Sequence, residues 1–232
     1  MAALVACGTR TEDRVTRRTA VEHGRAIYLD PRASPSTVNR FACVTCHVAE
    51  PRDDDGKLRP GAPLAGVLAR PTYWHGQEDD ALRAINACRI YFMGAQEPWS
   101  RGDEEAKALY AYLSGLPASG PPVAVPFTVV ESAVDLPAGD RARGKVVFDT
   151  ACSSCHGAKR TGEGRLTERA PKLPEQTLAE HTYLSPTDRR VVFVEKVRHG
   201  VFLGYSGTMP PFSREVMSDA DLSALLAYLD LY

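Results

Sequence analysis

Hydrophobic and polar positions along the chain follow helical spacing. The run His23-Gly24-Arg25-Ala26-Ile27-Tyr28 places an aromatic residue four positions after a glycine, and Arg143-Gly144-Lys145-Val146-Val147-Phe148 repeats this arrangement. Residues four apart lie on the same face of a helix. We therefore expect a short amphipathic helix at each position, with the glycine allowing another helix to approach closely.

A second pair of similar segments lies further along the chain. Asp103-Glu104-Glu105 precedes Ala108-Leu109-Tyr110-Ala111-Tyr112-Leu113, and Ser218-Asp219-Ala220-Asp221 precedes Ala224-Leu225-Leu226-Ala227-Tyr228-Leu229. Acidic residues in a first turn suit the helix dipole, and Ser218 is a suitable N-cap. The sequence predicts a helix closing each of two repeated units.

Strand patterns are scarce, and the run from Val191 to Val194 continues helically to Arg198. Between Ser114 and Asp140 the chain contains five prolines, which break helices and stiffen linkers. We therefore predict an all-α protein of two similar units joined by a Pro-rich linker. The predicted segments are a tether (1–18), a first unit (19–116), a Pro-rich linker (117–138) and a second unit (139–232).

Composition excludes several classes of protein. The 232 residues include 28 Lys and Arg against 29 Asp and Glu, and 44% are hydrophobic. This balance is that of a globular protein and excludes a disordered or collagen-like chain. No run of about 20 apolar residues is long enough to span a bilayer. The even charge excludes a basic nucleic-acid footprint.

The beginning of the chain contains a possible lipidation site. Leu4-Val5-Ala6-Cys7 resembles a bacterial lipobox, in which the cysteine receives the lipid. The alternative is a free cysteine in a disordered tail. Residues 9–18 are polar and Arg-rich, which favours a flexible tether.

Two cysteine motifs indicate the chemistry. Cys43-x-x-Cys46-His47 and Cys152-x-x-Cys155-His156 each have the Cys-x-x-Cys-His pattern of c-type haem attachment. Two thiols one helical turn apart can reach both vinyl groups of one porphyrin, and the histidine supplies the proximal ligand. Zinc knuckles and dithiol redox motifs share the Cys-x-x-Cys part. The repetition within matching units favours two covalently bound haem c groups.

A distal ligand is predicted in the second unit. Met209 lies in the loop Gly204-Tyr205-Ser206-Gly207-Thr208-Met209-Pro210-Pro211-Phe212, directly before the closing helix. A thioether on haem iron raises the reduction potential, and prolines stiffen the loop. Core packing is the alternative role for a methionine.

The second unit resembles a class I cytochrome c domain, through Cys152-x-x-Cys155-His156, the Met209 loop and the Tyr228 helix. The first unit resembles a modified form of that fold. The resemblance implies that the carbonyl oxygens of Pro63 and Pro171 accept the other N–H of each proximal histidine, which fixes the tautomer.

The distal ligand of the first unit has three alternatives. Met93 aligns with Met209 but is followed by Gly94-Ala95 instead of two prolines. Cys88, beside Arg89, is a second candidate, because a neighbouring cation favours the thiolate. An open site is the third, and His75 is a weaker candidate than either sulfur ligand.

The run Ile85-Asn86-x-Cys88-Arg89, with the Ala-Tyr-Leu helix after it, resembles the cysteine-ligated haem domain of diheme thiosulfate dehydrogenases and SoxA-type cytochromes. This resemblance implies that Cys88 binds iron and that sulfur chemistry takes place there. Four arginines near this segment would suit a sulfur oxyanion, haem propionates or the acidic residues 78–80. They are Arg70, Arg83, Arg89 and Arg101.

The sequence thus predicts a diheme c-type cytochrome that passes single electrons between redox proteins in the periplasm or elsewhere outside the cytoplasm. The alternative is a thiosulfate dehydrogenase, in which tetrathionate forms at the first haem and electrons leave through the second. A diheme peroxidase is less favoured because it needs an open haem site and a longer chain.

Overall fold

The computed structural model describes residues 9–33, 40–49, 55–118, 120–128, 136–200 and 207–231. Side chains are described from residue 19 onward within these ranges, except at residue 33. The regular structure in this part of the chain is helical, apart from one antiparallel bridge between Tyr73 and Glu78. The predicted all-α fold is confirmed.

The first half (residues 9–116) contains four α-helices and two short 3₁₀ turns within the described residues. The helices are α1 (Thr9–Leu29), α2 (Cys43–Cys46), α3 (Ala81–Tyr91) and α4 (Glu104–Leu113), and the turns are η1 (Pro31–Ala33) and η3 (Val67–Ala69). Since α1 begins at Thr9, the segment predicted as a tether (residues 1–18) is helical from residue 9 onward. Residues 9–18 contain neither glycine nor proline to interrupt a helix. Cys7 lies outside the described residues.

In the second half (residues 139–231), helical structure runs without a break from Arg141 to His156. It comprises α5 (Arg141–Val147), a π-helical turn η4 (Phe148–Cys152) and α6 (Ser153–His156). The remaining helices are α7 (Glu175–Glu180), α8 (Pro186–His199) and α9 (Asp219–Tyr228). The helix predicted through residues 191–198 is confirmed as part of α8.

Side-chain caps define several helix starts. The Ser218 hydroxyl accepts a hydrogen bond from the amide of Asp221 at 3.1 Å, which confirms the predicted N-cap of α9. Ser185 caps α8 in the same way, and the Asp80 carboxylate accepts from the Arg83 amide at the start of α3. Such caps satisfy amides that have no partner within the helix.

The predicted glycine contacts are confirmed in both halves. A Cβ atom added to Gly24 of α1 would overlap the carbonyl oxygen of Ala108 in α4. A Cβ atom added to Gly144 of α5 would overlap the carbonyl oxygen of Ala224 in α9. In each half, therefore, two helices cross at a distance that only glycine permits.

An aromatic pair extends each of these crossings. The rings of Tyr28 and Tyr112 lie 5.6 Å apart between α1 and α4. Those of Phe148 and Tyr228 lie 5.4 Å apart between η4 and α9. The two halves therefore place equivalent residues at equivalent positions.

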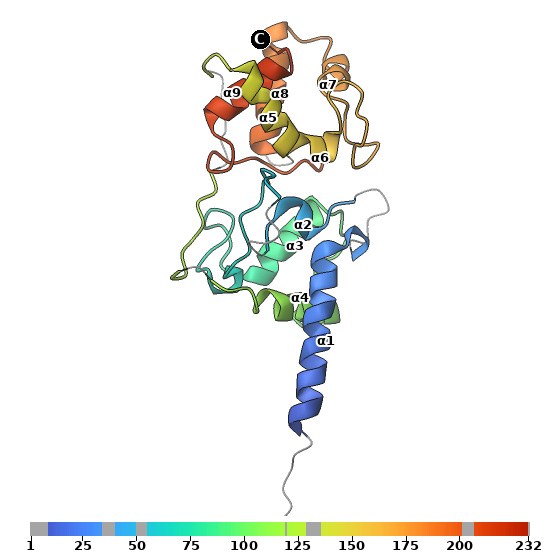
Figure 1. Ribbon diagram of the computed structural model, residues 1–232, viewed down its shortest axis with the longest axis vertical. Helices are drawn as coiled ribbons and strands as arrows, with labels where there is room; N and C mark the ends of the chain where they lie inside the picture. Colours follow the sequence, from blue (N-terminus) through green and yellow to red (C-terminus); the bar gives the residue numbers. More distant parts are fainter. Residues whose placement is uncertain are drawn as a thin grey trace, which may run out of the picture.

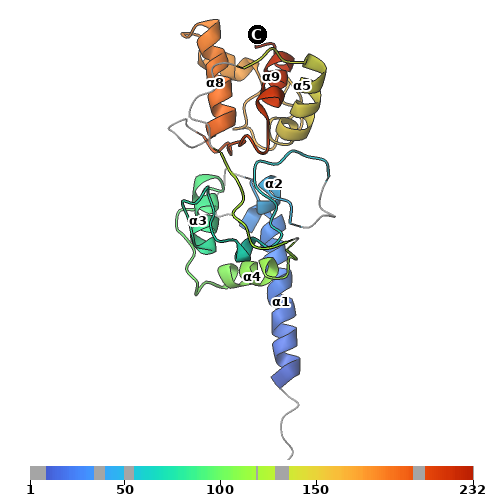
Figure 2. The same ribbon diagram turned by 90° about the vertical axis from the view of Figure 1, so that its left-hand side faces the viewer.

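Figures 1 and 2 show the two halves stacked along the long axis of the molecule, with the first part of α1 extending beyond them. Each half has its own cluster of buried hydrophobic side chains. The halves also meet directly, since the Leu58 amide donates to the carbonyl oxygen of Thr150 at 3.0 Å and Leu58 packs against the core of the second half.

The described residues of the Pro-rich segment are irregular and contact both halves. Phe127 packs edge-on against Trp74 of the first half, with ring centroids 5.6 Å apart. The amide and hydroxyl of Thr128 donate to the Glu215 carboxylate of the second half at 2.9 and 2.5 Å. These contacts hold the segment against the folded structure on both sides.

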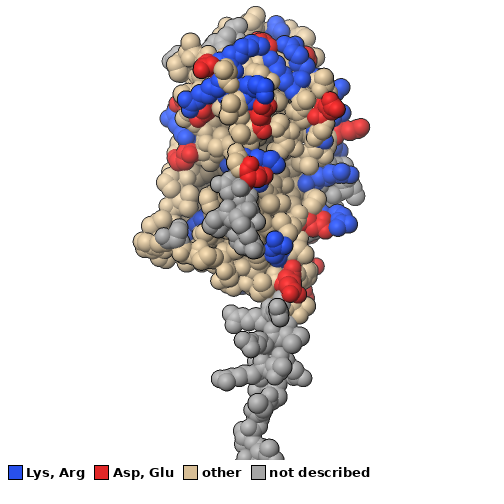
Figure 3. Space-filling model, viewed as in Figure 1, with Lys and Arg blue, Asp and Glu red and all other residues tan. Residues whose placement is uncertain are grey.

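The surface bears charges of both signs. On the face shown in Figure 3, Lys and Arg side chains over the second half alternate with Asp and Glu, in keeping with the net charge of −1. No helix in the described ranges is long and apolar enough to cross a membrane.

Candidate haem sites

The proximal site of the first half is built on α2. This single turn places Cys43 and Cys46 three residues apart, at its two ends, and His47 follows immediately. The His47 Nδ1 atom lies 2.8 Å from the carbonyl oxygen of Ala62. A ring held by a hydrogen bond from Nδ1 keeps Nε2 available as a metal ligand.

This bond corrects the prediction that Pro63 is the acceptor. The Pro63 carbonyl oxygen accepts instead from the guanidinium of Arg70. In the second half, His156 Nδ1 lies 2.9 Å from the carbonyl oxygen of Pro171. Both acceptors follow their histidine by 15 residues, so spacing rather than the presence of proline locates them.

Burial keeps both imidazoles neutral. It lowers the pKa of His47 and of His156, although the hydrogen bonds to Ala62 and Pro171 oppose the shift. The neutral imidazole is the form that binds a metal. Burial also raises the pKa of Cys43 to about 11 and that of Cys152 to about 12.

In the first half, Tyr28 holds the backbone that follows the haem motif, at residues 47–49, a role not predicted from the sequence. The Tyr28 hydroxyl donates to the carbonyl oxygen of His47 at 2.8 Å and accepts from the amide of Ala49 at 3.1 Å. Phe148 occupies the equivalent position in the second half and has no hydroxyl. The sequence contains a signal for this hydrogen-bonding hydroxyl, because Tyr28 and Phe148 occupy the same position in the two repeated segments.

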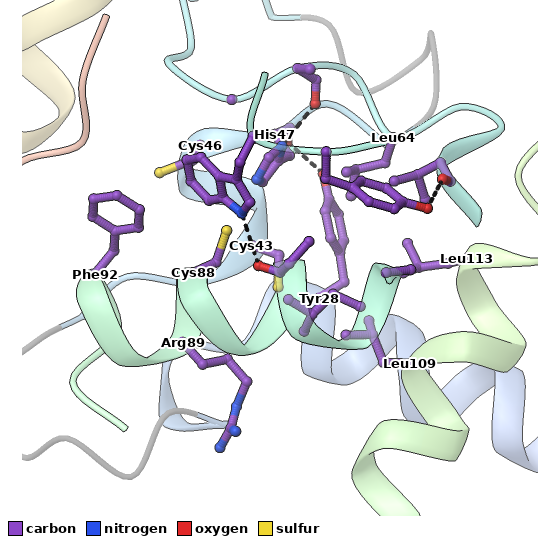
Figure 4. A pocket seen from close by; sticks show the side chains of 18 of the residues that line it. Tyr28, Cys43, Cys46, His47, Leu64, Cys88, Arg89, Phe92, Leu109 and Leu113 are labelled. Atoms are coloured by element: carbon purple, nitrogen blue, oxygen red, sulfur yellow. Dashed lines mark hydrogen bonds between the residues drawn. The ribbon is translucent and has the colours of Figure 1, made fainter. Parts of the chain in front are cut away.

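A deep, mainly apolar pocket lies between α2 and α3, and it contains about 1460 Å³ of empty space including its mouth. Figure 4 shows His47 on one wall, with Cys88 of α3 directed toward it from the other. Cys43 and Cys46 also line the pocket. An apolar pocket with a histidine, two attachment thiols and a second sulfur facing the histidine fits a covalently bound haem.

Both sulfur candidates for the distal position line this pocket. Cys88 projects from the last turns of α3 into the space between Cys43 and Cys46 (Figure 4). Met93 is buried just beyond the end of α3, where its amide donates to the Cys88 carbonyl oxygen at 3.3 Å. The geometry places the Cys88 sulfur on the wall opposite His47.

Arg89 does not act on Cys88 as the sequence suggested. Its side chain leaves α3 on the other side from Cys88, as Figure 4 shows, and its guanidinium lies over the Trp99 ring, 3.7 Å from the centroid. Burial raises the pKa of Cys88 to about 12, and the Cys43 thiol adds to this. The idea that Arg89 stabilises a Cys88 thiolate is therefore wrong, because neighbours on a helix point in different directions.

The Arg89 side chain belongs instead to a hydrogen-bond network that connects α3 to the segment before α4. Arg89 donates to the Asn86 side-chain oxygen and to the Glu97 carbonyl oxygen, both at 3.2 Å. Asn86 exchanges two hydrogen bonds of 2.8 Å with the backbone of Trp99. This network holds Trp99 in the pocket wall.

The other arginines have partners of their own. Arg83 pairs with Glu78 at 2.7 Å and with Asp79, and Arg101 pairs with Asp80. Arg70 lines the pocket and donates to the backbone carbonyls of Pro63 and Ala65. The acidic residues therefore account for Arg83 and Arg101.

Aromatic and proline residues that the sequence analysis did not assign complete the pocket wall. Trp74 donates from its ring nitrogen to the Ala84 carbonyl oxygen at 3.4 Å. Phe127 of the Pro-rich segment and Pro210 and Pro211 of the second half also line the pocket. His75, the weaker ligand candidate, is exposed and is not among the lining residues.

In the second half, Met209 is partly buried and packs against the cluster that contains Cys152. Residues 204–206 of its loop lie outside the described range. His156, Cys152, Cys155 and Met209 together are a donor set that fits haem c. Among the described residues, no three His, Cys, Asp or Glu side chains gather closely enough to hold a bare metal ion.

Comparison with known proteins gives a family match in the second half. Residues 139–229 match the family described as "Cytochrome C oxidase, cbb3-type, subunit III". This region is a cytochrome c domain. It therefore binds haem c covalently and transfers electrons, and such domains fit an extracytoplasmic location.

A similar solved structure is the thiosulfate dehydrogenase TsdBA from Marichromatium purpuratum in its "as isolated" form. The identity is 18% and the TM-score 0.45, and the alignment covers 92% of the present chain and 46% of the other. The present chain thus spans about half the length of that one. A search of curated proteins finds no match.

Proposed function

We propose that the protein is a diheme c-type cytochrome with one haem c in each half, passing single electrons between redox proteins outside the cytoplasm. The observation that supports it best is the repeated proximal geometry. Each Cys-x-x-Cys-His motif is followed, 15 residues later, by a carbonyl oxygen within 2.9 Å of the histidine Nδ1. Two such sites in one chain indicate two haem groups and a two-unit architecture.

The residues have separate roles in this proposal. Cys43 and Cys46 attach the first haem and Cys152 and Cys155 the second, with His47 and His156 as proximal ligands. The bound haem iron supplies the one-electron redox centre. We assign Cys88 as the first distal ligand, because it faces His47, and Met209 as the second.

These ligands imply a direction for electron flow. A thioether ligand raises a haem potential, whereas a thiolate ligand increases electron density on the iron. Electrons would then pass from the first half to the second. The closeness of the two motifs supports this path. Burial raises the pKa of the Cys46 thiol well above its usual value, and Cys88 and Cys155 add to the shift, so Cys155 of the second motif lies near Cys46 of the first.

The test is a count of haems on the purified full-length protein. Mass spectrometry under denaturing conditions should show the added mass of two haems, and replacing both cysteines of either motif by alanine should remove one. Redox titration of the unaltered chain should show two separate centres. A single haem on the unaltered chain would overturn the proposal.

The alternative proposal is a thiosulfate dehydrogenase. Two thiosulfates would join through a new S–S bond to form tetrathionate, and the two electrons released would leave through the second half. The position of Cys88 in an open-mouthed pocket favours it. Arg70 and Arg89 line the pocket, but Arg89 lies over Trp99 on the other side of α3 from Cys88. Arg83 and Arg101 pair with carboxylates, which argues against the proposal.

An anaerobic experiment separates the two functions. Thiosulfate is added to the oxidised protein and tetrathionate to the reduced protein, while the haem absorption bands are recorded. Rapid, saturable change favours the enzyme. Absence of change, with both haems still exchanging electrons with another cytochrome, favours the carrier.

We also propose that Cys7 bears a lipid that attaches the protein to a membrane. The support is the run Leu4-Val5-Ala6-Cys7. Replacing Cys7 by serine in the full precursor should move the protein from the membrane fraction to the soluble fraction. An unchanged distribution would contradict the lipid attachment.

A further inference from the structure

Arg198 is the most deeply buried charged residue in the described part of the chain, with no exposed surface. A buried cation is costly unless hydrogen bonds and an opposite charge compensate it. One guanidinium nitrogen of Arg198 donates to the carbonyl oxygens of Phe212 at 3.1 Å and Met217 at 2.7 Å. The other donates to the Asp219 carboxylate at 2.6 Å.

These partners lie at the end of the segment that contains Met209 and in the residues that follow it. Phe212 ends the Met209-Pro210-Pro211-Phe212 run, and Asp219 begins α9. Arg198 therefore connects the Met209 segment to the closing helix. Since α9 crosses α5 at Gly144, the same contact connects Met209 to the helices that lead to Cys152 and His156.

The backbone of α8 contacts the Met209 segment next to Arg198. The Phe212 amide donates to the Val197 carbonyl oxygen at 2.8 Å. A Cβ atom added at Gly200, directly after α8, would overlap the Met209 carbonyl oxygen and lie 2.7 Å from the Pro211 nitrogen. The last turn of α8 thus determines where the Met209 backbone lies.

We propose that Arg198 is a positioning residue that fixes the Met209 segment and so holds the Met209 sulfur on the haem iron. This inference rests on the proposed role of Met209 as distal ligand. A planar guanidinium can donate in two directions at once, toward the loop carbonyls and toward Asp219. A lysine at this position keeps the charge but offers a single point donor, so it should not replace that function.

Binding of imidazole to the oxidised haem tests the proposal, because imidazole must displace Met209. The apparent affinity of such a ligand is proportional to the fraction of molecules in which Met209 is released. A substitution that loosens the Met209 segment should therefore raise imidazole affinity in proportion to the fraction of molecules with Met209 released. The absorption band of methionine-ligated ferric haem and the reduction potential report the same bond independently.

The central variant is Arg198→Lys in the haem-loaded, full-length protein. We expect imidazole affinity at the second haem to rise about tenfold, the methionine band to weaken and the potential of that haem to fall. Gly200→Ala should act in the same direction by displacing the Met209 carbonyl. It keeps the test decisive should the lysine variant fail to fold.

The matched control is Arg214→Gln. Arg214 lies 3.3 Å from the same Asp219 carboxylate but is half exposed. Its loss should leave imidazole affinity within about twofold of the unaltered protein, since an exposed ion pair contributes little. Met209→Ala identifies the methionine band and gives the limit of complete ligand loss.

The outcomes distinguish the positioning role of Arg198 from the ligand role of Met209. If Met209→Ala changes the band and the potential but folded Arg198→Lys and Gly200→Ala behave like the unaltered protein, the role of Arg198 is wrong and that of Met209 stands. If Met209→Ala changes neither, the ligand assignment itself fails, and the inference fails with it.

Discussion

The two halves share one arrangement around the proximal histidine and differ on the opposite side of the haem site. In both, a glycine contacts a helix backbone, and an aromatic pair packs beside it. The facing residues come from α3 in the first half, whereas in the second the Met209 loop follows α8. The side that carries the Cys-x-x-Cys-His motif is thus a common scaffold, and in the proposed function the distal side would set the chemistry of each half.

The halves also differ in how their haem motif connects to the preceding helix. Cys152 follows Phe148 by four residues within continuous helical structure, whereas Cys43 follows Tyr28 by fifteen. The longer connection gives α2 no helical continuity with α1. The two hydrogen bonds of the Tyr28 hydroxyl join α1 to the proximal loop in its place.

Replacing each proposed distal ligand by alanine should give the largest effects, with reduction potentials that shift in opposite directions in the two halves. Cys88→Ala should change the low-spin EPR signal of the first haem and raise its potential, because electron donation by sulfur is lost. Met209→Ala should lower the potential of the second haem. Both shifts are expected to be sizeable within the roughly 0.8 V range that axial ligands span.

Met93→Ala is the matched control in the first half, since Met93 lines the same pocket. It should leave the EPR signal of the first haem unchanged. If Met93→Ala alters the signal and Cys88→Ala does not, the distal ligand of the first half is a methionine, and the contrast between the halves disappears.

Substitution of the crossing glycines tests the shared scaffold. Gly24→Ala and Gly144→Ala should each destabilise the haem-loaded protein by about 1–3 kcal/mol, because the added methyl overlaps a backbone carbonyl that cannot rotate away. Chemical denaturation followed by haem absorbance measures this. Gly120→Ala is the control, because a Cβ there meets nothing within 4 Å. A large cost in only one half would contradict the equivalence.

Much of this scaffold was predictable because its determinants are local. The spacing from Gly24 to Tyr28, and from Gly144 to Phe148, lies within one helical turn, and so do the haem motifs. The acceptors of the proximal histidines were harder, since a backbone carbonyl has no residue preference. Proline misled the assignment at Pro63, whereas the 15-residue spacing identifies Ala62.

Contacts distant in sequence were not predictable in the same way. Phe127 and Pro211 line the pocket of the first half only because the chain returns there in three dimensions. Arg198 did leave a signal. It lies four residues after Val194, on the same helix face as a fully buried hydrophobic residue, where a charged side chain requires a specific partner.

The Tyr28 hydroxyl offers a smaller and more local test of the difference between the halves. Tyr28→Phe should cost about 1–3 kcal/mol, because the Ala49 amide is left without its partner in a buried position. The second half is the internal control, since Phe148 already lacks a hydroxyl. Thermal unfolding should show the loss in the first half, with the haem spectrum of the second half unchanged at the same temperature. Equal loss in both would contradict a local role.

The smallest expected effect concerns the Pro-rich segment between the halves. Burial tends to raise the pKa of Glu215, but the hydrogen bonds from Thr128 outweigh it and lower the pKa to about 2. A carboxyl whose pKa falls on folding contributes stability above its unfolded value, and the contribution is lost as the pH falls toward 2. Because Glu215 is exposed, we expect only about 0.5 kcal/mol.

Glu215→Gln should therefore lower the unfolding free energy slightly at pH 6 and by progressively less toward pH 2. Glu163→Gln, an exposed carboxylate elsewhere in the second half, is the control and should show no such trend. Denaturant titrations at several pH values measure both. A Glu215→Gln difference that stays constant with pH would mean that the ionised carboxylate does not hold Thr128, and that other contacts, such as Phe127 against Trp74, fix the segment instead.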